Sequence, residues 1–141
     1  MLVLFIRFLT YKVSNFTLFI GTMRRTATIL FHARQQAHFW HLDTRSFSEH
    51  KCLEGFYTEL LELTDKLLEE YMGKGNRIDF GGVRMTFHAY NRDKMIEYFK
   101  KLNRYINRAK KSLKPGDGNL CNIMDEILGL INKTLYLFTL K

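Results

Sequence analysis

Histidine and carboxylate side chains are the residues of this 141-residue chain whose spacing points to chemistry. His38, His41 and His50 fall within thirteen residues, and two carboxylates, Asp65 and Glu69, follow four residues apart. Imidazole nitrogen and carboxylate oxygen together form a ligand set for iron, zinc or manganese. Taken singly, the histidines could be polar residues of a helix interface, and the carboxylates could belong to a solvated face. The spacing of the whole set favours a metal site.

The segment that carries His50, Asp65 and Glu69 is predicted to be one helix. It opens on Ser46-Phe47-Ser48-Glu49, which has the form of a capping box, in which the Ser and Glu side chains each satisfy a free amide of the first turn. On a straight helix, fifteen residues separate His50 from Asp65 by about 22 Å, too far for one ion within a subunit. Two copies packed antiparallel about a two-fold axis could bring the histidines of one to the carboxylates of the other. The spacing therefore predicts a dimer with two equivalent sites.

The elements that must position these residues are predicted from the scarcity of turn residues. One proline and nine glycines favour long helices over the many short strands of a sandwich or barrel. Apolar residues recur with a helical period from Met23 onward, and Asn91 or Asp93 can cap the third helix. The predicted helices span roughly residues 23–43, 46–71, 91–113 and 119–139, with one long connection over 74–90. This pattern predicts an all-α fold, an antiparallel four-helix bundle over residues 23–141.

Residues 1–22 form an apolar extension that we keep apart from the bundle. Arg7 and Lys12 interrupt the apolar run, which falls short of the roughly 18 uninterrupted residues of a spanning helix. An interfacial anchor, an appended strand and a mobile extension all remain open, and so does a natural start at Met23. We expect no stable membrane insertion.

The two cysteines indicate the redox environment in which the protein is expected to work. Cys52 and Cys121 match neither a zinc-ligand pair nor a disulfide framework. A reducing environment, and therefore a cytoplasmic location, is the expectation.

The residues from His50 to Glu69 carry a family resemblance. Counted from His50, the tyrosine at +7 (Tyr57), the aspartate at +15 and the glutamate at +19 resemble the second helix of the starvation-induced DNA-protecting ferritins (Dps). The resemblance implies a ferritin-like bundle in which His50, Asp65 and Glu69 are ligands of an iron-oxidising site shared across a dimer interface. It also implies an upstream histidine, which is His38 if the sequences align without gaps and His41 if the connection here is three residues shorter.

The stretch from His41 to His50 is also similar to a compact ferritin-like family of uncharacterised phage proteins, and for this reason we favour His41. Iron, with zinc or manganese as substitutes, is the expected metal, and oxidation by peroxide or dioxygen is the expected reaction. The chain has no clear copy of the short extra helix of Dps, so a dimer is better founded than a twelve-subunit cage. The Glu-x-x-His pattern of a di-iron site contained in one subunit is absent from the sequence.

The charge of the chain supports an alternative function. The formal net charge of +8 conceals an acidic segment at 49–73 and a strongly basic one at 74–115. A stripe of cations on the third helix could neutralise phosphates of DNA, or it could be a solvated face. The alternative function is a non-enzymatic bundle that binds nucleic acid or a protein partner through this stripe, whose candidate residues are Lys100, Lys101, Arg104, Arg108 and Lys111.

Overall fold

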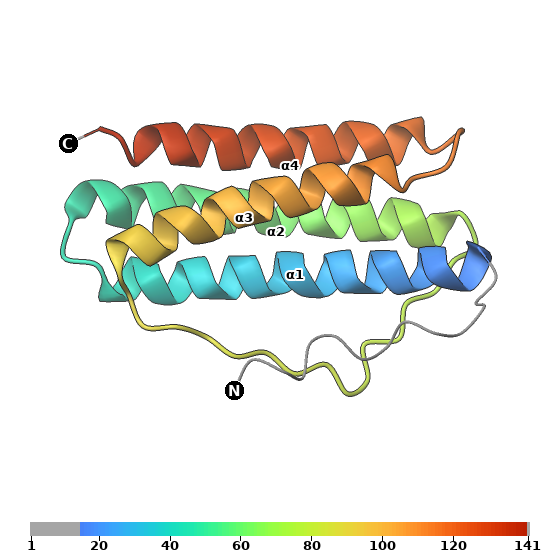
Figure 1. Ribbon diagram of the computed structural model, residues 1–141, viewed down its shortest axis with the longest axis horizontal. Coiled ribbons are helices and arrows are strands. Elements are labelled where there is room, and N and C mark those ends of the chain that lie inside the picture. The colour runs from blue at the N-terminus through green and yellow to red at the C-terminus, as the bar shows by residue number, and fades with distance from the viewer. Residues whose placement is uncertain (1–14, 141) are drawn as a thin grey trace.

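The computed structural model describes residues 15–140 of the chain, with side chains from Thr22 onward, and these residues form a four-helix bundle (Figure 1). This confirms the predicted all-α fold. Helix α1 packs against α2 and α3, and α4 packs against α2 and α3, so each helix has two neighbours. A single long crossover makes α2 and α3 run in the same direction, and every neighbouring pair is therefore antiparallel (Figure 1). The helices are α1 (Asn15–Asp43), α2 (Phe47–Gly73), α3 (Arg92–Lys111) and α4 (Gly118–Leu137).

Helix α1 begins earlier than predicted. Its first residue is Asn15, eight residues before the expected start at Met23, so the proposed boundary between residues 22 and 23 lies inside a helix. The reason is that a helix, once nucleated, extends as long as no residue breaks it, and neither proline nor a pair of glycines intervenes here. The rest of the predicted extension, residues 1–14, lies outside the described residues, so the alternatives for it stay predictions.

Helix α2 begins with only half of the predicted capping box. The Ser46 hydroxyl accepts the backbone N–H of Glu49 at 3.4 Å, which confirms the N-cap. The backbone N–H of Ser46 instead donates to the Thr44 hydroxyl at 3.2 Å. The Glu49 carboxylate turns inward, where it accepts from the Thr44 and Tyr90 hydroxyls and pairs with Arg92. The reciprocal bond of the box is absent because this buried network binds Glu49 and joins the α1–α2 turn to the start of α3.

The predicted connection at residues 74–90 crosses the molecule beside α1 (Figure 1). Side chains of α1 form hydrogen bonds with backbone N–H and C=O groups of this connection, groups that in a sheet would pair with a neighbouring strand. Arg24 donates to the carbonyls of Asp79 and Gly81, at 2.6 and 2.9 Å. Gln36 both donates to the carbonyl of His88 and accepts its N–H, at 3.0 and 2.8 Å. The crossover is thus held in place along the outside of α1.

The remaining helix limits agree with the sequence. The Asn91 side chain accepts the N–H of Lys94 at 3.0 Å and caps α3, which settles the choice between Asn91 and Asp93. The chain breaks at Pro115, and Gly116 takes a φ of 96° that favours glycine. Over the described residues, none of the helices combines the length and apolar character that crossing a membrane requires.

Cys52 offers a local check on this packing. Its thiol faces α4, with the sulfur 3.7 Å from the carbonyl of Thr134, and burial raises the pKa of the thiol to about 11, with Lys133 acting weakly in the opposite direction. We expect a Cys121→Ser chain to react with iodoacetamide at pH 8 about 100-fold more slowly when folded than in urea, because the thiolate is the nucleophile. The Cys52→Ser chain is the control for cysteine chemistry in general, and equal rates for folded and unfolded Cys52 would contradict this packing.

Candidate metal centre

His41 and His50 are joined by two reciprocal hydrogen bonds at the turn between α1 and α2. Each ring donates from Nδ1 to the backbone carbonyl of the other residue, both at 2.8 Å. The rings stack with centroids 3.6 Å apart. A carbonyl oxygen can only accept, so both Nδ1 atoms carry hydrogen, and in the neutral imidazoles both Nε2 atoms keep a free lone pair. Metal-binding histidines commonly donate their other ring N–H in this manner, which orients the ring.

His38 lies beside this pair. Its ring stacks on Tyr57 at 4.3 Å and lies 5.9 Å from the ring of His41. Burial lowers the pKa of His38, and the Arg34 guanidinium and the His41 imidazole lower it further. A neutral His38 can also offer a lone pair, so the structure brings all three predicted histidines together. The His41 ring is oriented by its hydrogen bond to the carbonyl of His50, whereas the choice between His41 and His38 as a ligand stays a prediction.

Asp65 and Glu69 lie far from the histidines on the same helix. Helix α2 is continuous from Phe47 to Gly73, so the separation of about 22 Å between His50 and Asp65 along the helix holds. Both carboxylates are exposed, and neither has a hydrogen bond or ion pair with any residue that the structure describes. Glu62 shares this property. Other acidic side chains of α2 are engaged: Glu54 with Lys51, Glu59 with Lys133, and Glu70 with Asn119.

Within one chain these residues do not form a complete site. Across residues 22–140, no three His, Cys, Asp or Glu side chains converge closely enough to hold an ion. A site made from the predicted residues therefore needs a second copy of the chain.

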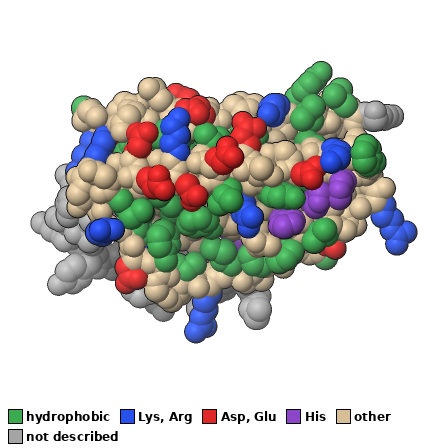
Figure 2. Space-filling view, turned by 180° about the vertical axis from the view of Figure 1, so that it is seen from behind, with side chains coloured by type: hydrophobic (Ala, Val, Ile, Leu, Met, Phe, Trp, Pro, Cys, Tyr) green, Lys and Arg blue, Asp and Glu red, His purple; other side chains and the backbone are tan. Residues whose placement is uncertain are grey.

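The surface of the molecule opposite the view of Figure 1 carries both histidine and acidic side chains (Figure 2). Histidines gather at one end of this face, acidic side chains lie mainly toward the other end, and hydrophobic side chains lie between them (Figure 2). On α2, Tyr57 and Leu61 lie between His50 and Asp65 in the sequence, and Leu61 is a large hydrophobic residue with 37% of its surface exposed.

Glu54 is a neighbour of the histidines that the sequence reasoning missed. Lys51 lowers the pKa of Glu54 through a hydrogen bond and its charge, and the imidazoles of His41 and His50 add a smaller effect in the same direction. Glu54 does not come close enough to complete a metal site with His41 and His50 among the described residues. Its spacing of four residues after His50 was the signal that could have found it.

The predicted cations of α3 lie apart from the three candidate histidines at the α1–α2 turn. Arg104 pairs with Glu97 at 2.9 Å. Lys101, Arg104 and Arg108 line a pocket between α1 and α3, and Lys100 lines a second pocket beside the end of α4. All five side chains are exposed: Lys100, Lys101, Arg104, Arg108 and Lys111.

Comparison with known proteins places the chain in a family. Residues 41–138, more than half of the chain, match the model of a family of unknown function, DUF5856. The chain belongs to this family. The match begins at His41 and spans His50, Asp65 and Glu69.

A relative comes from a bacteriophage. The chain is 25% identical over 114 residues to an uncharacterised 14.6 kDa protein in the mobD-ri intergenic region of Enterobacteria phage T4, across 80% of this chain and 84% of that protein. No solved structure matches the chain. Neither the DUF5856 description nor that of the phage relative names a ferritin.

Proposed function

We propose that this member of the DUF5856 family is a Dps-like protein that binds ferrous iron at two ferroxidase-type sites shared across a two-fold dimer. The observation that carries the proposal is the pair of reciprocal hydrogen bonds between His41 and His50, which orient both imidazole rings and leave both Nε2 lone pairs free. The single long crossover of the bundle, which is also the connectivity of ferritin-like folds, adds support.

The proposed dimer has a definite register on α2. In this register His50 faces the midpoint between Asp65 and Glu69 of the partner, so the two-fold axis crosses α2 near residue 58. Gly55 then faces the partner's helix near residue 62. Gly55 is exposed, and a methyl group at its position would meet no atom within 4 Å in one chain. The absence of a side chain there allows two copies of α2 to approach closely.

The residues would divide the chemistry between them. His41 and His50 supply neutral nitrogen ligands, while Asp65 and Glu69 supply hard anionic oxygens that favour the ferric product over the ferrous substrate. Each ferrous ion gives up one electron, and one peroxide molecule takes two electrons and two protons to form two water molecules. The product would be ferric iron held or released by the dimer, which amounts to iron sequestration or oxidative protection.

Anaerobic ferrous titration tests the metal site. We expect Asp65→Ala/Glu69→Ala to weaken binding at least tenfold and to slow oxidation by peroxide, because half of the proposed ligands are lost. The matched control is Glu59→Ala/Glu70→Ala, which removes two acidic residues of α2 that bond to α4 instead. Equal affinity and equal oxidation rates in the wild type and the Asp65/Glu69 variant would refute the proposal.

The exposed cations of α3 support a second candidate, nucleic-acid binding. If Lys100, Lys101, Arg104 and Arg108 neutralise phosphates, DNA affinity must fall steeply with salt and fall again when they are replaced by alanine. DNA affinity that responds to neither change would exclude this candidate.

A further inference from the structure

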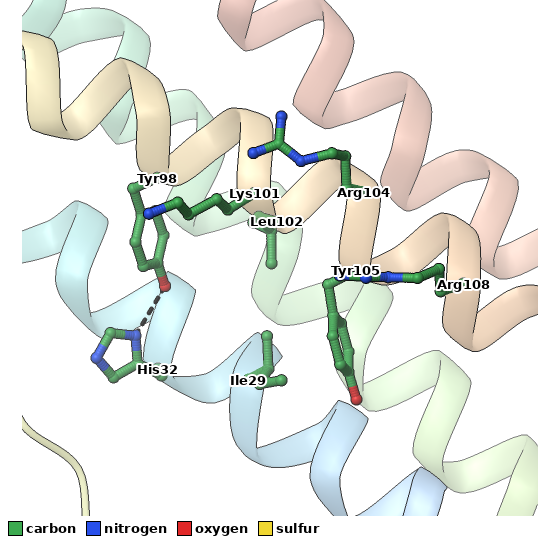
Figure 3. A pocket seen from close by; sticks show the side chains of 8 residues that line it. All are labelled: Ile29, His32, Tyr98, Lys101, Leu102, Arg104, Tyr105 and Arg108. Carbon is green, nitrogen blue, oxygen red and sulfur yellow. Dashed lines mark hydrogen bonds between the residues drawn. The ribbon is translucent and has the colours of Figure 1, made fainter. Parts of the chain in front are cut away.

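A pocket of about 500 Å³ opens between α1 and α3, apart from the histidines at the α1–α2 turn (Figure 3). These two helices pack less closely than the other neighbouring pairs. The size falls in the range of pockets that bury small organic ligands.

The walls of the pocket are apolar. Ile29 of α1 and Leu102 of α3 line it together with the rings of Tyr98 and Tyr105 (Figure 3). Such walls accept an apolar body and offer it no hydrogen-bond partner.

The polar atoms of the wall residues are already engaged. His32 Nε2 lies 2.8 Å from the Thr86 carbonyl and must donate to it, so in the neutral ring Nδ1 accepts from the Tyr98 hydroxyl at 2.7 Å. The Tyr105 hydroxyl bonds to the Thr26 hydroxyl at 3.2 Å. The two tyrosines therefore present ring surface to the cavity.

Cations of α3 line the pocket beside these apolar side chains. Lys101 and Arg108 have no ion pair among the residues that the structure describes, and in Figure 3 their side chains extend toward Tyr98 and Tyr105. Arg104 also lines the pocket, but its guanidinium pairs with Glu97. On the α1 side, the Arg25 guanidinium lies 5.8 Å from the centre of the Tyr105 ring. Lys101 and Arg108 lie two helical turns apart, about 10 Å, so their long side chains can close on one anionic group from both sides.

We propose that the α1–α3 pocket binds an anionic amphiphile, a molecule with an apolar body inside the cavity and one carboxylate or phosphate between Lys101 and Arg108. The apolar body follows from the apolar side chains of the pocket, and the anionic group follows from Lys101 and Arg108, which line the pocket and are exposed. A fully polar anion such as a free nucleotide would leave its polar groups against apolar walls, which is costly. This ligand site is independent of the proposed iron site.

Displacement of a fluorescent probe tests the proposal on the full chain. We expect 8-anilinonaphthalene-1-sulfonate to bind with saturation at one molecule per chain and to be displaced by dodecanoate or dodecyl phosphate. Dodecanol should compete about tenfold more weakly because it lacks the charge, and AMP should not compete because it lacks the apolar body.

Variants connect the binding to the pocket. Lys101→Ala/Arg108→Ala should weaken dodecanoate about tenfold and leave dodecanol unchanged. Ile29→Trp should abolish the binding of both by filling the cavity, and circular dichroism should show that each variant is folded. The control, Lys111→Ala, removes an exposed cation of α3 that does not line the pocket. The proposal fails if the probe does not bind, if dodecanol competes as well as dodecanoate, or if binding survives both pocket variants.

Discussion

Replacing Trp40 by alanine should lower the free energy of unfolding by about 3–5 kcal/mol, which is the usual cost of removing a buried aromatic side chain from a core. Trp40 is only 1% exposed. Its indole N–H also donates to the carbonyl of His88 at 3.0 Å, so the same side chain fills the bundle and holds the crossover against α1. Urea denaturation followed by circular dichroism measures the loss.

Trp40→Phe separates these two contributions. Phenylalanine keeps an aromatic ring in the core but has no N–H, and the His88 carbonyl retains its bond from Gln36. We therefore expect a loss of about 1–2 kcal/mol, well below that of the alanine variant. A Trp40→Ala chain as stable as Trp40→Phe would show that Trp40 does not pack as described.

Replacing Arg92 by alanine should cost about 2–3 kcal/mol, because it leaves a buried carboxylate without its cation. The Glu49 side chain is 4% exposed, whereas that of Arg92 is 47% exposed, so water can compensate in part and the cost stays below that of a fully buried pair. The hydroxyls of Thr44 and Tyr90 continue to donate to Glu49, at 2.8 and 2.5 Å.

The double variant Glu49→Leu/Arg92→Ala provides the control for this pair. It removes the buried charge together with its partner, so we expect it to be more stable than Arg92→Ala alone. Urea denaturation of the wild type, Glu49→Leu, Arg92→Ala and the double variant gives the interaction energy of the pair. A double variant less stable than Arg92→Ala would contradict the description of Glu49 as a buried charge that depends on Arg92.

The helices could be predicted because their signals are local. The helical period of the apolar residues and the caps at Ser46 and Asn91 indicated α2 and α3 directly. The start of α1 could not be predicted in the same way, because residues 15–22 show no clear amphipathic period and yet continue the helix.

The network around Glu49 could not be predicted from the sequence because its partners are distant. Tyr90, which lies 41 residues away, donates to the Glu49 carboxylate, and the backbone N–H of Ser46 donates to Thr44 instead. The capping-box motif therefore predicted the Ser46 cap correctly and the bond from Ser46 N–H to Glu49 wrongly. The contacts of the crossover could not be predicted either, because its backbone carbonyls accept hydrogen bonds from α1 side chains about fifty residues earlier in the sequence.

The separation of His50 from Asp65 and Glu69 could be predicted from the sequence, because α2 is continuous between them. The reciprocal bonds of His41 and His50 could not, because they depend on the path of the α1–α2 turn, which leaves the carbonyl of each residue beside the ring of the other. Asparagine can keep an amide donor near the position of Nδ1 while it lacks Nε2, so it should remove the proposed metal-binding atoms and keep the turn closed.

Mixing two inactive chains tests the shared site most directly. One chain carries His41→Asn/His50→Asn and the other carries Asp65→Ala/Glu69→Ala. Each alone should form dimers without an intact site. When equal amounts are unfolded and refolded together, half of the dimers should be mixed and hold one intact site of two, so about a quarter of the wild-type iron sites should return. Recovery of that fraction in an anaerobic ferrous titration is the result we predict. A mixture that binds no more iron than its separate components, or a component that binds as the wild type does, would contradict a site built from two subunits.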